Sequence, residues 1–419
     1  MTETGIATGV PSSAGTGRAG FRRLLAGIGI AGGALSAMYA GVGIILLPLQ
    51  VERIDRAHKV AALGVVAGVS AMFALVFNPI GGALSDRTRS RFGRRAPWLV
   101  TASAGMLVML ALLGQAGTVL LVLIAWCLAQ AVANLYQAPL TAVIPDRVSV
   151  ARRGAASAVA GVASVLGGVA GVGLTSQFTR HLAWGYLAVG GVVVATAGYF
   201  VLTTADPPTA DLPRPPHANF RLADFLSALR HRDFTLVFVS RAAAILGYFL
   251  VISYELYILT DYIRLPAGLK PAAGVTVLAA ISAVGALLAA AIAGPLSDRI
   301  NRRKPFVIIS SAVAGAGCVL PVLWPTFRTI EIFAAFAGIA FGCYLSVDAA
   351  LVTLVLPRSE DAARDLGVLN IANAGPQVIA PLLAALIIGH LGGYRTLFIA
   401  GGCCGIAGAL AVMPVRSVR

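Results

Sequence analysis

Twelve apolar runs, each long enough to cross a lipid bilayer as a helix, take up most of the chain. A membrane-spanning helix needs about 20 apolar residues, and the runs cover residues 24–49, 60–84, 97–115, 118–143, 155–178, 184–203, 235–261, 271–296, 305–325, 329–356, 367–391 and 394–414. With 58% hydrophobic and 12% charged residues, the chain cannot give a soluble fold a charged surface, and it is too apolar to be disordered. The pattern predicts an all-α integral membrane protein with twelve transmembrane helices.

The twelve runs fall into two groups of six that repeat each other. The longest polar gap, residues 204–233, is rich in proline and separates an N-terminal half (24–203) from a C-terminal half (234–414), with tails at 1–23 and 415–419. Residues 82–87 read Gly-Ala-Leu-Ser-Asp-Arg, and residues 294–299 read Gly-Pro-Leu-Ser-Asp-Arg. Pro145 and Pro357 are separated by the same interval as these two copies. A six-helix unit duplicated in parallel predicts a transporter whose substrate site lies between two moving halves.

Lysine and arginine are distributed unequally between the two sides of the predicted bundle. Of 32 such residues, 23 fall in the tails and in the loops on the same side, and 8 fall in the loops on the other side. The positive-inside rule therefore predicts a multi-pass protein of the cytoplasmic (plasma) membrane with both termini in the cytoplasm. The net charge of +15 follows from this topology, because the basic residues occupy short gaps and form no continuous stripe for nucleic acid.

The repeated motif resembles the loop between helices 2 and 3 of the major facilitator superfamily. The second copy, residues 294–304, follows the superfamily pattern, with Asn301 in place of a turn glycine. The first copy, residues 82–95, is longer, and this longer form is similar to the sucrose transporters and the related glycoside-pentoside-hexuronide cation symporters. Segments 145–154 and 369–381 also look like sugar-transporter-like members. The resemblance implies two pseudo-symmetric six-helix halves, transport by alternating access and function as a monomer.

In this superfamily the motif acts in gating. The resemblance therefore implies gating roles for Gly82, Asp86, Arg87, Arg94, Gly294, Asp298, Arg299 and Arg302. We expect each glycine to let a helix end approach its neighbour closely, and each aspartate to hold arginines and helix-end amides in a latch on the cytoplasmic side. The alternative is that most of these arginines only enforce topology.

Three charged residues lie within spans and away from helix ends: Arg241, Glu255 and Asp348. Asp348 precedes Pro357 by nine residues, which places it about 13 Å from the end of its helix and makes its carboxyl group a candidate for proton coupling. Glu255 shares a helical face with Tyr248 and is a second candidate. The alternatives are a neutral Asp348 that only packs and an interfacial Glu255 that reaches outer water. Arg241 is better placed to snorkel or to join the latch.

Polar side chains follow one face of the fourth span at helical spacing: Trp126, Gln130, Asn134 and Gln137. Amides offer donors and acceptors to sugar hydroxyls, and an indole ring packs on the apolar face of a pyranose. Further candidates for substrate contact in the first, seventh and eleventh spans are Tyr39, Tyr248, Asn370, Asn373 and Gln377. The alternative for the fourth span is hydrogen bonding between helices, worth about 0.6 kcal/mol per contact in membranes.

The sequence holds no nucleotide-binding glycine loop, no nucleophile with a paired base, and no His, Cys and carboxylate set with metal-ligand spacing. We therefore expect neither an enzyme nor a resident cofactor or metal. The second and fourth spans lack the acidic residues that hold the cation in sugar:cation symporters, which favours protons over sodium. The leading hypothesis is proton-coupled symport of a sugar-like small molecule. A proton-coupled drug or metabolite exporter is the main alternative, and a non-transporting membrane sensor is a more distant one.

Overall fold

Each of the twelve predicted spans contains helix long and apolar enough to cross a membrane. The computed structural model describes residues 18–204, 206, 229, 231–300, 304–355 and 362–415, with side chains for all of these except 18, 298, 345, 347–355 and 362–367. The all-α membrane architecture predicted from the sequence is therefore confirmed. Large apolar side chains such as Leu112, Leu120 and Ile292 are more than half exposed, as expected of surfaces that face lipid.

The N-terminal half begins with a span built from three consecutive pieces, α1 (Arg18–Ala40), a π-helix η1 (Gly41–Leu46) and α2 (Leu47–Ile54). Single helices follow: α3 (Lys59–Arg87), α4 (Ala96–Gly114), α5 (Val119–Arg147), α6 (Val150–Ser176) and α7 (Leu182–Thr203). The side chain of Thr118 caps α5 by accepting from the backbone N–H of Leu121 at 3.3 Å.

The C-terminal half contains α9 (Arg232–Ile252), α10 (Glu255–Asp261), α11 (Pro271–Ile300), α12 (Lys304–Gly317), α13 (Val319–Leu323), α14 (Phe327–Val355), α15 (Ala362–His390) and α16 (Gly393–Val412). A turn at Ser253 and Tyr254 interrupts the seventh span between α9 and α10. The residues on either side of this turn can therefore point to different neighbours.

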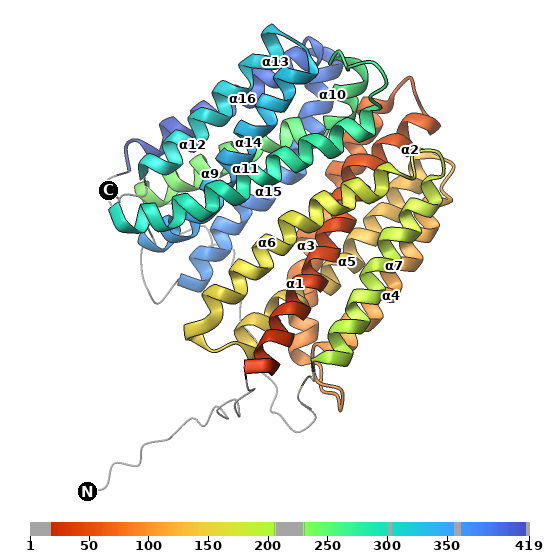
Figure 1. Cartoon of the computed structure of the whole chain (residues 1–419), viewed down its shortest axis with the longest axis vertical. Helices are drawn as coiled ribbons and strands as arrows, with labels where there is room; N and C mark the ends of the chain where they lie inside the picture. Colours follow the sequence, from red (N-terminus) through yellow and green to blue (C-terminus); the bar gives the residue numbers. More distant parts are fainter. Residues whose placement is uncertain are drawn as a thin grey trace, which may run out of the picture.

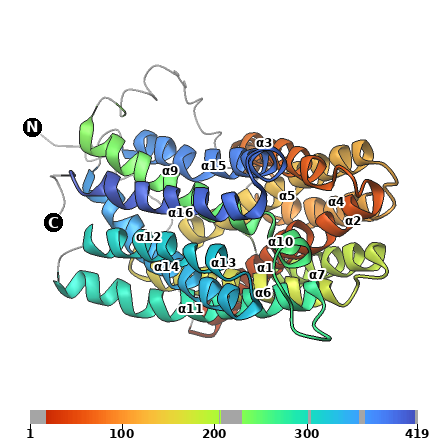
Figure 2. The same ribbon diagram turned by 90° about the horizontal axis from the view of Figure 1, so that it is seen from above.

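The two halves lie side by side, with α3 packed against α15 and α6 against α11 (Figures 1 and 2). Helix α1 begins and α16 ends at the same face of the bundle (Figure 1), which we call the terminal face. The opposite face carries loops 55–58, 115–118, 177–181 and 262–270, and we call it the distal face. An even number of spans requires this arrangement.

Glycines hold the helices within each half at backbone contact. A Cβ at Gly171 on α6 would collide with the backbone of Ala37 on α1. In the other half, a Cβ at Gly342 on α14 would collide with the backbone of Ala286 on α11. Helices in lipid gain little from the hydrophobic effect on each other, so van der Waals contact at small residues supplies much of their packing energy.

The close contact at Gly171 predicts that Gly171→Ala lowers the unfolding temperature of the detergent-purified protein. Overpacking of this kind costs about 1–3 kcal/mol. Gly161→Ala is the matched control on the same helix, because a Cβ there meets nothing within 4 Å. Thermal unfolding followed by intrinsic fluorescence compares the two variants, and equal unfolding temperatures would show that α1 and α6 are not in backbone contact.

Candidate functional site

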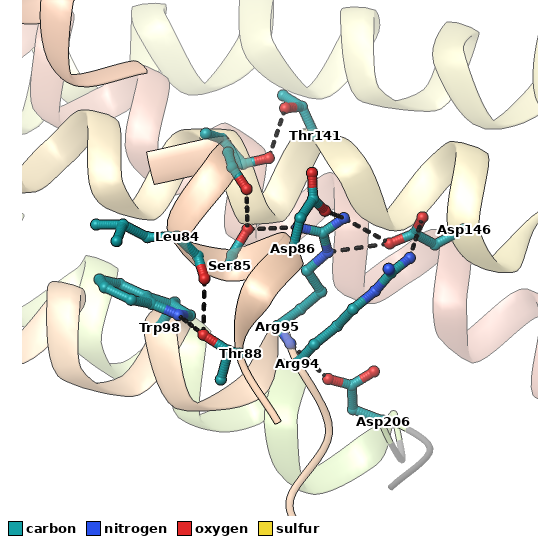
Figure 3. A network of polar contacts seen from close by, with 12 residues as sticks. Leu84, Ser85, Asp86, Thr88, Arg94, Arg95, Trp98, Thr141, Asp146 and Asp206 are labelled. Atoms are coloured by element: carbon teal, nitrogen blue, oxygen red, sulfur yellow. Dashed lines mark hydrogen bonds and ion pairs between the residues drawn. The ribbon is translucent and has the colours of Figure 1, made fainter. Parts of the chain in front are cut away.

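Two arginines at the end of the first motif copy anchor a group of charges at the terminal face (Figure 3). Arg95 Nη2 lies 2.6 Å from Asp86 Oδ1 and 2.9 Å from Asp146 Oδ2, and Arg95 Nε donates to the same Asp146 oxygen at 3.0 Å. Arg94 Nη2 lies 2.6 Å from Asp146 Oδ1. We call Asp86, Arg94, Arg95 and Asp146 the Arg95 cluster. Because only 5% of the Arg95 side chain is exposed, two carboxylates take the place of water around its charge.

Asp206, which follows α7, joins this cluster through the backbone of α4. Its Oδ2 accepts hydrogen bonds from the N–H groups of Arg95 at 2.8 Å and Ala96 at 3.1 Å, which are among the amides left unpaired at a helix start. Gly93 makes room for it: its φ is +85°, and a Cβ there would collide with the Asp206 side chain. The carboxylate thus connects the segment after α7 to the first turn of α4.

The structure shows which partner each of these charged motif residues has. Asp86 holds an arginine, as expected of a latch, but its partner is Arg95, which the sequence argument did not single out. Arg94 pairs with Asp146 at the end of α5. All of these contacts lie within the N-terminal half. A gating role for the cluster remains a prediction.

The structure contradicts the expectation that Gly82 allows close helix approach, because a Cβ at Gly82 would meet nothing within 4 Å among the described residues. For Gly294 the described neighbour is the Ser346 side chain at 3.8 Å, and the side chains at 345 and 347–355 lie outside the described residues, so its role stays a prediction. Gly81 makes the close approach in place of Gly82, since a Cβ there would lie 3.0 Å from the Cα of Leu135 on α5. The face of α3 that meets α5 is therefore rotated by one residue from the motif glycine.

The remaining gating candidates lie at helix ends. Arg87 and Arg299 are exposed at the ends of α3 and α11. The side chain of Asp298 and the whole of Arg302 lie outside the described residues. Of the second motif copy, Lys304 is described with its side-chain contact: its Nζ donates to the Val415 carbonyl at 3.0 Å.

At the distal face, charged and aromatic side chains join the two halves. Lys59 at the start of α3 lies 2.8 Å from Glu52 Oε1 and 2.9 Å from Asp261 Oδ1 in the other half. Tyr394 donates to Asp261 Oδ2 at 2.7 Å, and the Lys59 ammonium lies 4.6 Å from the ring centre of Tyr257. We call Glu52, Lys59, Tyr257, Asp261 and Tyr394 the distal cluster. Asp261 ends α10, so its position at a helix end places its carboxylate where the two halves meet.

Backbone acceptors extend this junction between the halves. Tyr257 donates to the Pro48 carbonyl at 2.8 Å, and Tyr254 donates to the Val60 carbonyl at 2.9 Å. Gly64 on α3 lies so close to α15 that a Cβ would stand 2.9 Å from the Pro381 carbonyl oxygen. The distal face is therefore closed by contacts between the halves.

Away from both faces, three helices of the N-terminal half bring four polar side chains together. Tyr39 on α1 donates to Gln137 Oε1 at 3.3 Å and accepts from Asn134 Nδ2 at 3.3 Å, both on α5. Asn78 on α3 donates to Asn134 Oδ1 at 3.1 Å. We call Tyr39, Asn78, Asn134 and Gln137 the amide cluster. Sequence reasoning missed Asn78, although an asparagine one residue before Pro79 in an apolar span was a visible signal.

The other predicted substrate contacts are distributed differently. The Gln130 carbonyl accepts from Asn134 at 2.9 Å, while Trp126 is 3% exposed and packs in the apolar core. On α15, Gln377 donates to the Asn373 carbonyl at 3.1 Å, and Asn370 is exposed. The structure thus joins Gln130 to the amide cluster through its backbone and leaves Trp126 and the α15 residues separate from it.

In the C-terminal half, Glu255 and Tyr248 line one cavity, although a turn separates their helices, so a common helical face does not bring them together. Glu255 is 8% exposed, and its Oε2 has no hydrogen-bond partner among the described residues. The side chain of Asp348, the other candidate for proton coupling, lies outside the described residues. Within the described part of the chain, no group of three or more His, Cys, Asp and Glu residues could hold a metal ion.

Comparison with known proteins gives one family and one fold. The family model of the Major Facilitator Superfamily matches residues 26–269 and 267–419. No curated protein sequence matches the chain.

Solved transporter structures superimpose on almost the whole chain. A bacterial homolog of the human lysosomal transporter Spinster, in an inward-facing and unoccupied conformation, is 14% identical over 95% of both chains, with a TM-score of 0.67. A mutant of the nucleoside transporter NupG is 12% identical over 94% of this chain and 99% of its own, with a TM-score of 0.74. The peptide transporter POT in complex with sulfate is 14% identical over 94% of both chains, with a TM-score of 0.73. At these identities the likeness shows the fold alone.

The hydrogen-bonded ion pairs of Arg95 predict that Arg95→Ala destabilises the protein by about 1.5–3 kcal/mol, because it removes the charge-assisted bonds to Asp86 and Asp146. Arg91→Ala in the same loop is the control, since Arg91 is exposed and contacts the ring of Phe92. Thermal unfolding of both purified variants makes the comparison. A loss no larger than that of Arg91→Ala would mean that the cluster does not stabilise the fold.

The ion pair across the distal face predicts that Asp261→Asn shifts the protein toward a state with this face open. Loss of about 1 kcal/mol corresponds to a roughly fivefold change in population. Spin labels at positions 117 and 267, introduced after replacing the five native cysteines, report the separation of the two distal loops. Asp55→Asn is the matched control, because Asp55 pairs with His58 in its own loop at 3.1 Å. An unchanged distance distribution in Asp261→Asn would show that the pair does not hold the halves together.

Proposed function

The chain belongs to the major facilitator superfamily and is a secondary transporter, and we propose that it carries a small sugar-like solute together with protons by alternating access. The amide cluster is the observation that carries the solute class. Tyr39, Asn78 and Gln137 are partly exposed polar side chains from three different helices, in spans that are mostly apolar. Their hydroxyl and amide groups offer both donors and acceptors, which is what a polyhydroxy solute requires.

The hydrogen bonds within the amide cluster support this role. The two contacts of Tyr39 are 3.3 Å long, at the weak end of the range, so solute hydroxyls can replace them at little cost. Side chains that already bond to one another hold a fixed orientation before the solute arrives, which reduces the entropy lost on binding.

We further propose that the terminal face is cytoplasmic, as the positive-inside rule predicts, and that the structure represents the state closed to the outside. The distal cluster then forms the outer gate, which must break for the site to open outward. The Arg95 cluster ties α3, α4 and α5 together, and Asp206 adds the segment after α7. Such ties suit a half that rotates as a rigid body.

Proton coupling is assigned to Glu255 and Asp348. Glu255 supports the proposal through its burial and its unpartnered oxygen, because a buried carboxyl group is stable when it carries a proton or meets a cation. Asp348 is assigned from its depth in the tenth span alone. Solute and proton would then bind to different halves, and the movement of one half against the other would couple them.

An apolar cavity in the C-terminal half favours a second candidate function, export of a drug-like or metabolic solute in exchange for protons. Tyr248, Phe333, Phe341 and Tyr344 contribute aromatic groups to its wall. An aromatic ring can pack on the apolar face of a sugar, but this wall offers few partners to the sugar hydroxyls, whereas an amphiphilic solute can fill it with its apolar part. The direction of proton movement distinguishes the two functions.

The experiment that tests the proposal uses the full-length protein in liposomes that enclose a pH-sensitive dye. Addition of a transported sugar or glycoside should carry protons inward, and an imposed proton gradient should drive its uptake. Proton flow opposite to the solute would establish the exporter function instead. Proton movement that is unchanged in Asp348→Asn would exclude Asp348 as the coupling residue.

The amide cluster predicts that Gln137→Ala raises the half-saturating solute concentration about tenfold, because it removes one of the partly exposed amides that would contact the solute. Gln177→Ala is the matched control: Gln177 lies at the distal end of α6 and bonds within its own helix end. Uptake of radiolabelled solute measures both variants. An unchanged half-saturating concentration in Gln137→Ala would mean that the cluster serves helix packing.

A further inference from the structure

Two adjoining cavities lie inside the C-terminal half, between α9, α12, α14 and α16 and at the start of α10. The larger measures about 60 Å³, and its wall includes Tyr248, Phe333, Phe341 and Tyr344. The smaller measures about 20 Å³ and is lined by Glu255. They share Tyr248, Phe333 and Ala337, so the two cavities adjoin at these side chains.

Glu255 lines the smaller cavity, and no positively charged side chain lines either cavity in the described part of the chain. Its side chain is buried, and Oε2 has no hydrogen-bond partner among the described residues. Of the hydroxyls in the wall, that of Ser282 already donates to the Ala334 carbonyl at 2.9 Å. A carboxylate in such surroundings requires a cation from outside the protein, or a proton.

The neighbouring turn separates this acid from the outer gate. Tyr254 and Tyr257, which flank Glu255 in sequence, bond to backbone carbonyls of the N-terminal half. Glu255 instead points into its own half. The carboxyl group is therefore not part of the junction that closes the distal face.

The aromatic side chains and the volume of the larger cavity indicate which class of ligand it can bind. Tyr248 and Phe341 stack with ring centres 4.7 Å apart and planes 12° from parallel. Each ring of this stack covers the inner face of the other, so their outer faces are the ones open to a ligand. Aromatic faces attract cations, and quaternary ammonium groups are commonly bound by aromatic side chains. A water molecule takes up about 10–15 Å³ of such a cavity. The larger cavity, of about 60 Å³, therefore holds roughly four heavy atoms. This is close to the size of a trimethylammonium group.

We infer that the larger cavity binds a small organic ammonium group, with Tyr248 and Phe341 as its aromatic contacts and Glu255, in the adjoining smaller cavity, as its counter-ion. This inference rests on the proposed function in one respect: the bound ammonium group is taken to be part of the transported solute. The solute class is then an amine that also carries hydroxyl groups.

Binding to the detergent-purified, full-length protein tests the site without reference to transport. Choline is the probe, and 3,3-dimethyl-1-butanol, which has the same shape without the charge, is the matched control ligand. Calorimetry should show choline binding at least tenfold more tightly than the neutral alcohol. Glu255→Gln should abolish this preference, whereas Glu331→Gln, a half-buried acid on α14 outside both cavities, should retain it.

Phe341→Leu provides a second test that leaves the acid in place. It should weaken choline binding at least threefold and leave the neutral alcohol unaffected. Equal affinity of the wild-type protein for the two ligands, or a preference that survives in Glu255→Gln, would overturn the inference. Sugar-driven proton uptake in liposomes is a separate measurement. A failure of choline binding would therefore overturn the cation site without overturning the transport function, and a failure of proton uptake would overturn the transport function without overturning the cation site.

Discussion

Helices surrounded by lipid have little hydrophobic reason to associate, and the whole structure depends on how closely their backbones can approach. Gly171 and Gly342 set that distance inside the two halves, and Gly64 sets it between them, against Pro381. Each lies where a methyl group would meet backbone atoms of the next helix. Once the backbones are this close, the polar side chains nearby have defined neighbours, and the positions of the charged and amide groups follow from the packing.

Charge serves different purposes at the two faces. At the terminal face, Arg95 bonds to Asp86 and Asp146 in its own half, so the contacts bind several helices into one body. At the distal face, Lys59 and Asp261 belong to different halves, so the contact binds two bodies to each other. A transporter whose halves rock against each other needs contacts within each half and contacts between the halves. Without the first, a half could not move as one body, and if the second were permanent, the halves could not move at all. Both faces use ion pairs between basic and acidic side chains. They differ in whether the two partners belong to the same half or to different halves.

Polar groups inside the spans are also divided in two ways. In the N-terminal half, Tyr39, Asn78, Asn134 and Gln137 bond to one another. In the C-terminal half, Glu255 faces an aromatic cavity with an oxygen that has no described partner. A satisfied network is stable without a ligand and recognises it by exchange of hydrogen bonds, whereas an unsatisfied acid is stabilised by the proton or cation it binds. One half is thus suited to neutral polar groups and the other to positive charge.

The sequence by itself determined the twelve spans, their division into two halves and the family, because span length, apolar content and the repeated motif are local properties of the chain. It also placed Gln130, Asn134 and Gln137 on one helical face, since the helical period alone fixes such neighbours within an unbroken helix. It did not determine that Gly81 rather than Gly82 meets α5, that Asp206 reaches the start of α4, or that Lys59 pairs with Asp261. Those contacts depend on the rotation of each helix about its axis and on the docking of one half against the other. A rotation of one residue, about 100° around the helix, exchanges one set of partners for another, and only the packed tertiary structure decides it.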